Sequence, residues 1–137
     1  MAGYSGTPLW KKLGMKEGSR WAVVGAPKGF AIEDRPDSAP TLTTIKGLLD
    51  GSVVFCTTKK QLDERIEAAI KAMPRDGSVW IAWPKKASSI KTELDFDLVQ
   101  HAGLGRGLVD NKCCAVDDDW SGLRFVVRVV DRAKWPR

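Results

Sequence analysis

The stretch SVVFCTTKKQLDERIEAAIKAMPRDGSVWIAW, residues 52–83, contains two apolar runs separated by a segment with helical periodicity. The runs at residues 52–57 and 78–83 are short and continuous, which is typical of strands buried on both faces. Between them, apolar residues recur at three- and four-residue spacing over residues 62–73, as on the buried face of a helix. The stretch therefore predicts parallel strands joined by a right-handed helical crossover.

Two of the expected helices begin with capping residues, and the signal for a third helix is weak. Thr58 and Gln61 match a capping box at the start of the central helix. Near the N-terminus, Thr7 is expected to cap a short helix, and Pro8 suits the first helical position. A weak helical segment is also expected from about Phe30. The central helix is the best defined of the three.

The flanking segments continue the alternation of strands and helices. Residues 20–25 form another buried-type run, and residues 41–45 predict a shorter strand at or near a sheet edge. A helix is expected at residues 93–102. Residues 108–116 and 123–130 then predict the two arms of an antiparallel hairpin.

These elements predict one α/β domain over residues 1–137. The expected architecture is a three-layer Rossmann-like sandwich, with a mostly parallel sheet that ends in a C-terminal antiparallel hairpin. This arrangement resembles a reduced class I methyltransferase fold. A shared fold does not by itself transfer an activity.

Composition indicates a cytoplasmic globular protein. The chain has 43% hydrophobic and 28% charged residues, and its net charge of +5 is only mildly basic. No apolar run is long enough to span a membrane, and the first 13 residues lack the pattern of a signal peptide. The three cysteines are an odd number and lack metal-ligand spacing, so reduced and packed thiols are expected.

Lysine follows each of three predicted parallel strands. In open α/β sheets, ligands bind outside the carboxyl ends of the strands, so these loops are expected to share one rim. Such a rim would attract phosphate, sulfate or carboxylate, although solvated loop lysines would give the same pattern. The candidate ligand-binding residues are Gly25, Lys28, Gly29, Lys59, Lys60, Trp83, Lys85, Lys86 and Ser88.

Catalytic and cofactor motifs are weak. The Gly25–Gly29 loop lacks the full G-x-G-x-x-G pattern, and no ribose-binding acid is evident after residues 41–45. The sequence therefore leaves the cofactor unknown and disfavours dinucleotide or S-adenosylmethionine binding. Residues 117–119 are three aspartates that fit a solvated turn better than a metal site. With His101 as the single histidine, no catalytic residues can be assigned.

Several motifs together resemble a bacterial, largely actinobacterial family known as domain of unknown function 3052. The resemblance covers nearly the whole chain and implies a small intracellular bacterial protein. It implies no activity, cofactor or catalytic residue. The motifs are GYSGTPL at 3–9, KLG at 12–14, VGAP at 24–27 with GF at 29–30, WPKKAS at 83–88, LVDNK at 108–112 and WSGLR at 120–124.

We therefore favour a non-catalytic ligand-binding or regulatory domain, whose lysine rim holds an anionic small molecule or an acidic protein partner. One alternative is a methyltransferase-like or nucleotide-using enzyme. Another is a weak nucleic-acid binder that uses Trp10, Trp83 or Trp135, although no recognised motif supports it. The oligomeric state is open, and the strand at 123–130 could pair across a homodimer if it lies at a sheet edge. No membrane partner is expected.

Overall fold

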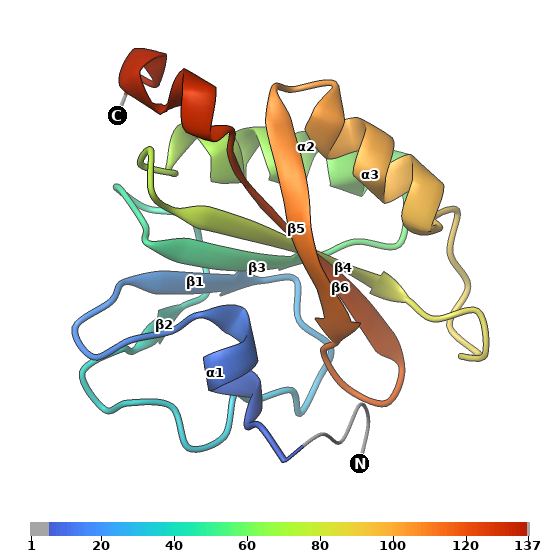
Figure 1. Ribbon diagram of the computed structural model, residues 1–137. Helices are drawn as coiled ribbons and strands as arrows, with labels where there is room; N and C mark the ends of the chain where they lie inside the picture. The colour runs from blue at the N-terminus through green and yellow to red at the C-terminus, as the bar shows by residue number, and fades with distance from the viewer. Residues whose placement is uncertain (1–5, 137) are drawn as a thin grey trace.

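The predicted strand–helix–strand unit lies at the centre of a six-stranded sheet in the computed structural model, which describes residues 6–136 (Figure 1). The strand order is β2-β1-β3-β4-β6-β5. β1 to β4 are parallel to their neighbours within that group, whereas β6 is antiparallel to both β4 and β5. The strands are β1 (Trp21–Val24), β2 (Thr41–Leu42), β3 (Gly51–Phe55), β4 (Ser78–Pro84), β5 (Leu108–Ala115) and β6 (Trp120–Val127).

Two longer helices, α2 (Lys59–Lys71) and α3 (Phe96–Leu104), cover one face of the sheet (Figure 1). The short helix α1 (Leu9–Leu13) and the loops beside β2 cover the other face. A 3₁₀ helix, η1 (Val129–Lys134), follows β6. This is the predicted Rossmann-like α/β fold, in reduced form.

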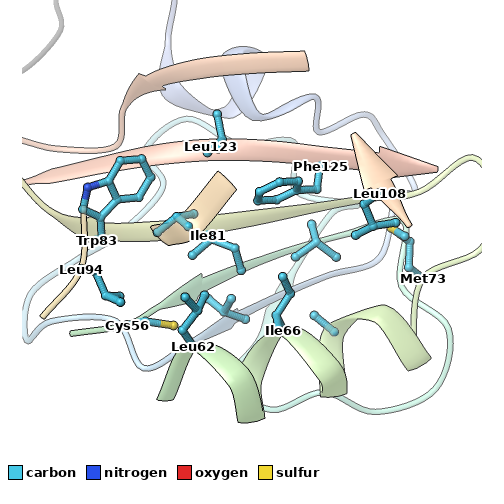
Figure 2. Close-up of a cluster of buried hydrophobic side chains, with 14 of the residues drawn as sticks. Cys56, Leu62, Ile66, Met73, Ile81, Trp83, Leu94, Leu108, Leu123 and Phe125 are labelled. Carbon is cyan, nitrogen blue, oxygen red and sulfur yellow. The ribbon is translucent and has the colours of Figure 1, made fainter. Parts of the chain in front are cut away.

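The sheet separates two apolar cores. On the α2 and α3 face, Ile66 and Leu62 pack against Ile81 and Phe125 (Figure 2). Trp80 belongs to the opposite core. Trp83 lies on the same side as Ile81, so the expected alternation along β4 is confirmed.

Two local predictions were wrong. Residues 25–40 form turns and no helix, because Pro27 and Pro36 interrupt the segment. Phe30 instead packs edge-on against Phe55, with 5.0 Å between ring centroids. At the N-terminus the cap position is Pro8, with no side-chain hydrogen bond, and the expected cap from Thr7 is not formed. The part of the first family motif at residues 3–5 lies outside the described residues.

The C-terminal hairpin is present, but its two strands occupy different places in the sheet. β6 lies between β4 and β5, and β5 is the edge strand. The condition for dimerisation through residues 123–130 is therefore not met. A register shift between Asp110 and Lys112 marks a bulge in β5. Within residues 6–136, no helix combines the length and apolar character needed to cross a membrane.

Candidate active site

The strand order reverses at β1, so a topological switch point lies at the carboxyl ends of β1 and β3. From β1 the chain passes to β2 on one side of it and then to β3 on the other. A topological switch point of this kind is where open α/β sheets bind ligands. The loop after β1 turns through Gly25 and Gly29, at φ of 71° and 84°, conformations that residues with a side chain rarely adopt.

The two glycines of this loop have different surroundings. A side chain at Gly29 would meet nothing within 4 Å, so this part of the loop is open. A side chain at Gly25 would collide with the guanidinium of Arg65 and approach the carbonyl oxygen of Phe55 to 3.2 Å. Gly25 is therefore required for the close approach of α2 to the end of β1.

Arg65 places a positive charge at the switch point. Its Nη1 donates a hydrogen bond to the carbonyl oxygen of Phe55, the last residue of β3. The same guanidinium hydrogen-bonds the Cys56 thiol. Since a guanidinium carries five N–H donors, these two contacts leave donors that could bind a carboxylate at the switch point.

Arg65 was not among the residues predicted from the sequence, although a signal for it was present. Residue 65 is three positions after Leu62 and four before Ala69, both of which are buried on α2. An arginine at the spacing of a buried stripe is expected to bring its head group to the end of a strand or into a crevice.

Cys56 follows β3 directly and is fully buried. Burial raises the pKa of its thiol to about 11, an effect that the charge of Arg65 and its hydrogen bond only partly oppose. The thiol is therefore neutral at physiological pH and is no candidate nucleophile.

The amino end of α2 is satisfied by the protein's own groups. Thr58 Oγ1 accepts from the backbone N–H of Gln61 at 3.1 Å, as predicted. The Gln61 side chain reaches back one residue further than a capping box requires, to the N–H of Thr57 at 2.8 Å. Glu93 Oε1 accepts from the N–H of Lys59 at 2.8 Å. A carboxylate of the chain itself therefore occupies the position expected for a bound anion.

Lys59 and Lys60 are exposed on the first turn of α2. Lys60 lies 3.9 Å from Glu64 in an exposed ion pair, which is a weak interaction. Lys28 is also exposed, in the loop after β1. These lysines do not line the hollow at the end of β4 that contains the other candidates.

That hollow has a volume of about 290 Å³ and lies beyond the carboxyl end of β4. Trp83 and Phe96 form an aromatic wall, with 6.3 Å between their ring centroids. Lys85 and Lys86 lie at its rim. Ser88 does not line it, and its Oγ accepts from the N–H of Ile90 within its own turn. The structure thus brings together Trp83, Lys85 and Lys86 but no single rim of five lysines.

The aspartates at 117–119 form a local turn. Asp117 Oδ1 accepts from the backbone N–H groups of Asp119 and Trp120, at 2.8 and 2.9 Å. In the part of the chain that the structure describes, no group of three or more histidine, cysteine, aspartate or glutamate residues is placed to hold a metal ion.

Comparison with solved structures defines the fold class. Precorrin-6y C5,15-methyltransferase from Geobacter metallireducens matches 88% of this chain and 86% of its own, at 10% identity and a TM-score of 0.59. A SAM-dependent methyltransferase from Aquifex aeolicus matches 87% and 88%, at 13% identity and 0.57. The ribosomal protein L11 methylase of Lactobacillus delbrueckii subsp. bulgaricus matches 88% and 75%, at 13% identity and 0.54. The chain therefore has a class I methyltransferase-like fold.

No family model and no curated protein matches the sequence. The structural matches nevertheless correct our functional preference. The favoured non-catalytic domain with an anion-binding lysine rim was wrong, because the matching structures are methyltransferases. In addition, the Glu93 carboxylate already accepts from the N–H of Lys59 at the start of α2, where the anion was expected.

Proposed function

We propose that this protein is a methyltransferase-like enzyme that binds S-adenosylmethionine at the switch point, beyond the carboxyl ends of β1 and β3. The observation that carries the proposal is the Arg65 guanidinium at the switch point of a methyltransferase-like sheet. S-adenosylmethionine has a carboxylate at its methionine end, and a guanidinium is a suitable partner for it.

The residues at the switch point fit most of this ligand. Gly29 leaves its part of the β1 loop open, so a ligand could approach the backbone there. Arg65 supplies the cation for the carboxylate. The segment after β2 carries Thr43 and Thr44 and no acidic side chain, so hydroxyl groups would have to contact the ribose. When bound, the ligand would supply an activated methyl group.

The hollow beyond β4 is the place we assign to the acceptor. It adjoins the end of the strand next to β3, and Trp83 and Phe96 give it an aromatic wall. An aromatic or apolar acceptor would bury its ring against this wall. Proton transfer from the acceptor has no assigned residue.

The direct test is binding of S-adenosylhomocysteine to the full chain, measured by calorimetry and thermal shift. We expect saturable binding that raises the melting temperature by mass action. Arg65→Met should weaken it about tenfold or more, since a charged hydrogen bond is lost. Arg128→Met, at an exposed position after β6, is the matched control and should bind normally. Absence of saturable binding by the wild-type chain would refute the proposal.

We further propose membership of the domain-of-unknown-function family 3052 and a cytoplasmic location. The motifs at 83–88 and 120–124 support the family. Three free cysteines support a reducing compartment, because exposed thiols such as Cys113 pair readily where disulfides form.

A further inference from the structure

The hollow beyond β4 has the size of a site for one small ring. Its volume is about 290 Å³. An apolar cavity of about 150 Å³ is enough to hold benzene, so this hollow has room for one substituted six-membered ring. A small ligand with a single ring therefore suits it.

Phe96 gives the hollow an accessible aromatic surface. It is the first residue of α3 and is 40% exposed, which is unusual for a large apolar side chain in this protein. The Trp83 ring meets it edge-on, and the buried Leu94 adds to the apolar lining. A ring placed in the hollow would cover this apolar surface, which is the main source of affinity in such sites.

Lys85 and Lys86 supply positive charge to the same hollow. They directly follow the last residue of β4, and Lys85 is half-buried. Among the described residues, neither ammonium group has a hydrogen-bond or ion-pair partner. The backbone N–H of Lys85 donates to the carbonyl oxygen of Asp119 at 2.8 Å, which fixes the start of this segment. An anion that reaches these ammonium groups would gain charged hydrogen bonds.

Other polar side chains that line the hollow are engaged within the protein. Thr92 Oγ1 donates to the carbonyl oxygen of Thr57 at 2.9 Å. Asp95 Oδ1 accepts from the N–H of Leu98 at 2.9 Å, so its negative charge is offset by the positive end of α3. The two ammonium groups thus remain available to a ligand.

The indole N–H of Trp83 is a third available donor. It has no hydrogen-bond partner within residues 6–136, and it is not among the donors sealed from solvent. Figure 2 shows this nitrogen on the side of the indole that points away from Leu123. A ligand with an oxygen atom beside its ring would satisfy this donor.

We propose that the hollow beyond β4 binds a single-ring aromatic carboxylate. The ring lies against Phe96 and Trp83, and the carboxylate accepts hydrogen bonds from Lys85 and Lys86. The role of this compound as the methyl acceptor rests on the proposed function, whereas its binding does not. Only two of the five lysines expected from the sequence take part, and the aromatic wall supplies much of the contact.

The test uses 4-hydroxybenzoate as the probe on the full chain, with calorimetry and thermal shift. 4-Hydroxybenzamide keeps the ring and lacks the charge, and 4-hydroxycyclohexanecarboxylate keeps the charge and lacks the aromatic ring. We expect saturable binding of 4-hydroxybenzoate and at least about tenfold weaker binding of each comparison compound. No saturable binding of 4-hydroxybenzoate, or equal binding of either comparison compound, would overturn the proposal.

Variants then locate the site. The double variant Lys85→Met, Lys86→Met should bind 4-hydroxybenzoate about tenfold more weakly or worse, and should bind the amide as wild type does. Lys91→Met is the matched control, because Lys91 is exposed in the same connection to α3 and does not line the hollow. Phe96→Leu should weaken binding of 4-hydroxybenzoate more than binding of the cyclohexane compound. Circular dichroism checks the fold of each variant. Unchanged binding of 4-hydroxybenzoate by the double variant would overturn the assignment.

The cofactor site is measured separately on the wild-type chain. Binding of S-adenosylhomocysteine without binding of 4-hydroxybenzoate would leave the proposed methyl transfer standing and overturn the present proposal. The reverse result would refute the proposed methyl transfer and keep the hollow as a binding site for aromatic carboxylates. The two failures are therefore distinguishable.

Discussion

The indole of Trp21 lies across the backbone of Gly51 on the neighbouring strand. A Cβ atom at Gly51 would lie only 2.3–2.5 Å from atoms of the six-membered ring of Trp21, which is a collision. The two residues are register partners in β1 and β3, and both belong to the buried part of the sheet. Position 51 therefore requires glycine, because the indole of Trp21, one of the largest side chains in the core, fills the space that a side chain would need.

Gly51→Ala should destabilise the protein by about 1–3 kcal/mol, since overpacking forces the indole or the strand to move. Urea unfolding followed by circular dichroism measures this change. In a double-mutant cycle with Trp21→Ala, the cost of Gly51→Ala should largely disappear. An equal cost in both backgrounds would show that the contact is not its cause.

Gly25→Ala and Gly29→Ala form a matched pair in the loop after β1. Both positions have positive φ, so each variant should lose about 1 kcal/mol through backbone strain. Only Gly25→Ala also collides with Arg65. We expect it to be the less stable variant and to bind S-adenosylhomocysteine more weakly. Equal stability of the two would argue against close packing of the guanidinium on Gly25.

The Cys56 thiol should make stability fall at alkaline pH. Burial raises its pKa from 9.0 to about 11, so the folded chain keeps a proton that the unfolded chain releases. The stabilisation is complete below about pH 9 and is lost as pH rises toward 11, with an upper figure of about 2–3 kcal/mol. Unfolding free energies of wild type and Cys56→Ala should therefore converge over this range. A constant difference would contradict the prediction.

Glu93→Ala should cost about 1 kcal/mol, because the N–H of Lys59 loses its charged acceptor at the positive end of α2. Glu93→Gln keeps an acceptor oxygen without the charge, so it should lose less. Thermal unfolding of the three proteins at low and high salt separates the charge from the hydrogen bond. Equal losses of stability in Glu93→Ala and Glu93→Gln would show that the charge of Glu93, and not its hydrogen bond, stabilises the helix.

The sequence alone determined the elements and their class. The apolar runs at 52–57 and 78–83 and the helical spacing between them define β3, α2 and β4, since periodicity reports how each segment is buried. The alternation of strand and helix then led to the parallel sheet. The helix predicted from about Phe30 is absent, because the helical pattern there is weak and prolines interrupt the loop.

Only the tertiary structure decided which side chains meet at each end of the sheet. Glu93 reaches the first turn of α2 from 34 residues away, and Arg65 lies against the end of β1. A hollow of about 340 Å³ at the amino ends of β1, β3 and β4 likewise joins distant segments, since it is lined by Trp21, Asp50, Ser78 and Arg124. Local sequence patterns do not predict these long-range contacts, because the contacts depend on how the connecting loops and helices place each segment in the sheet.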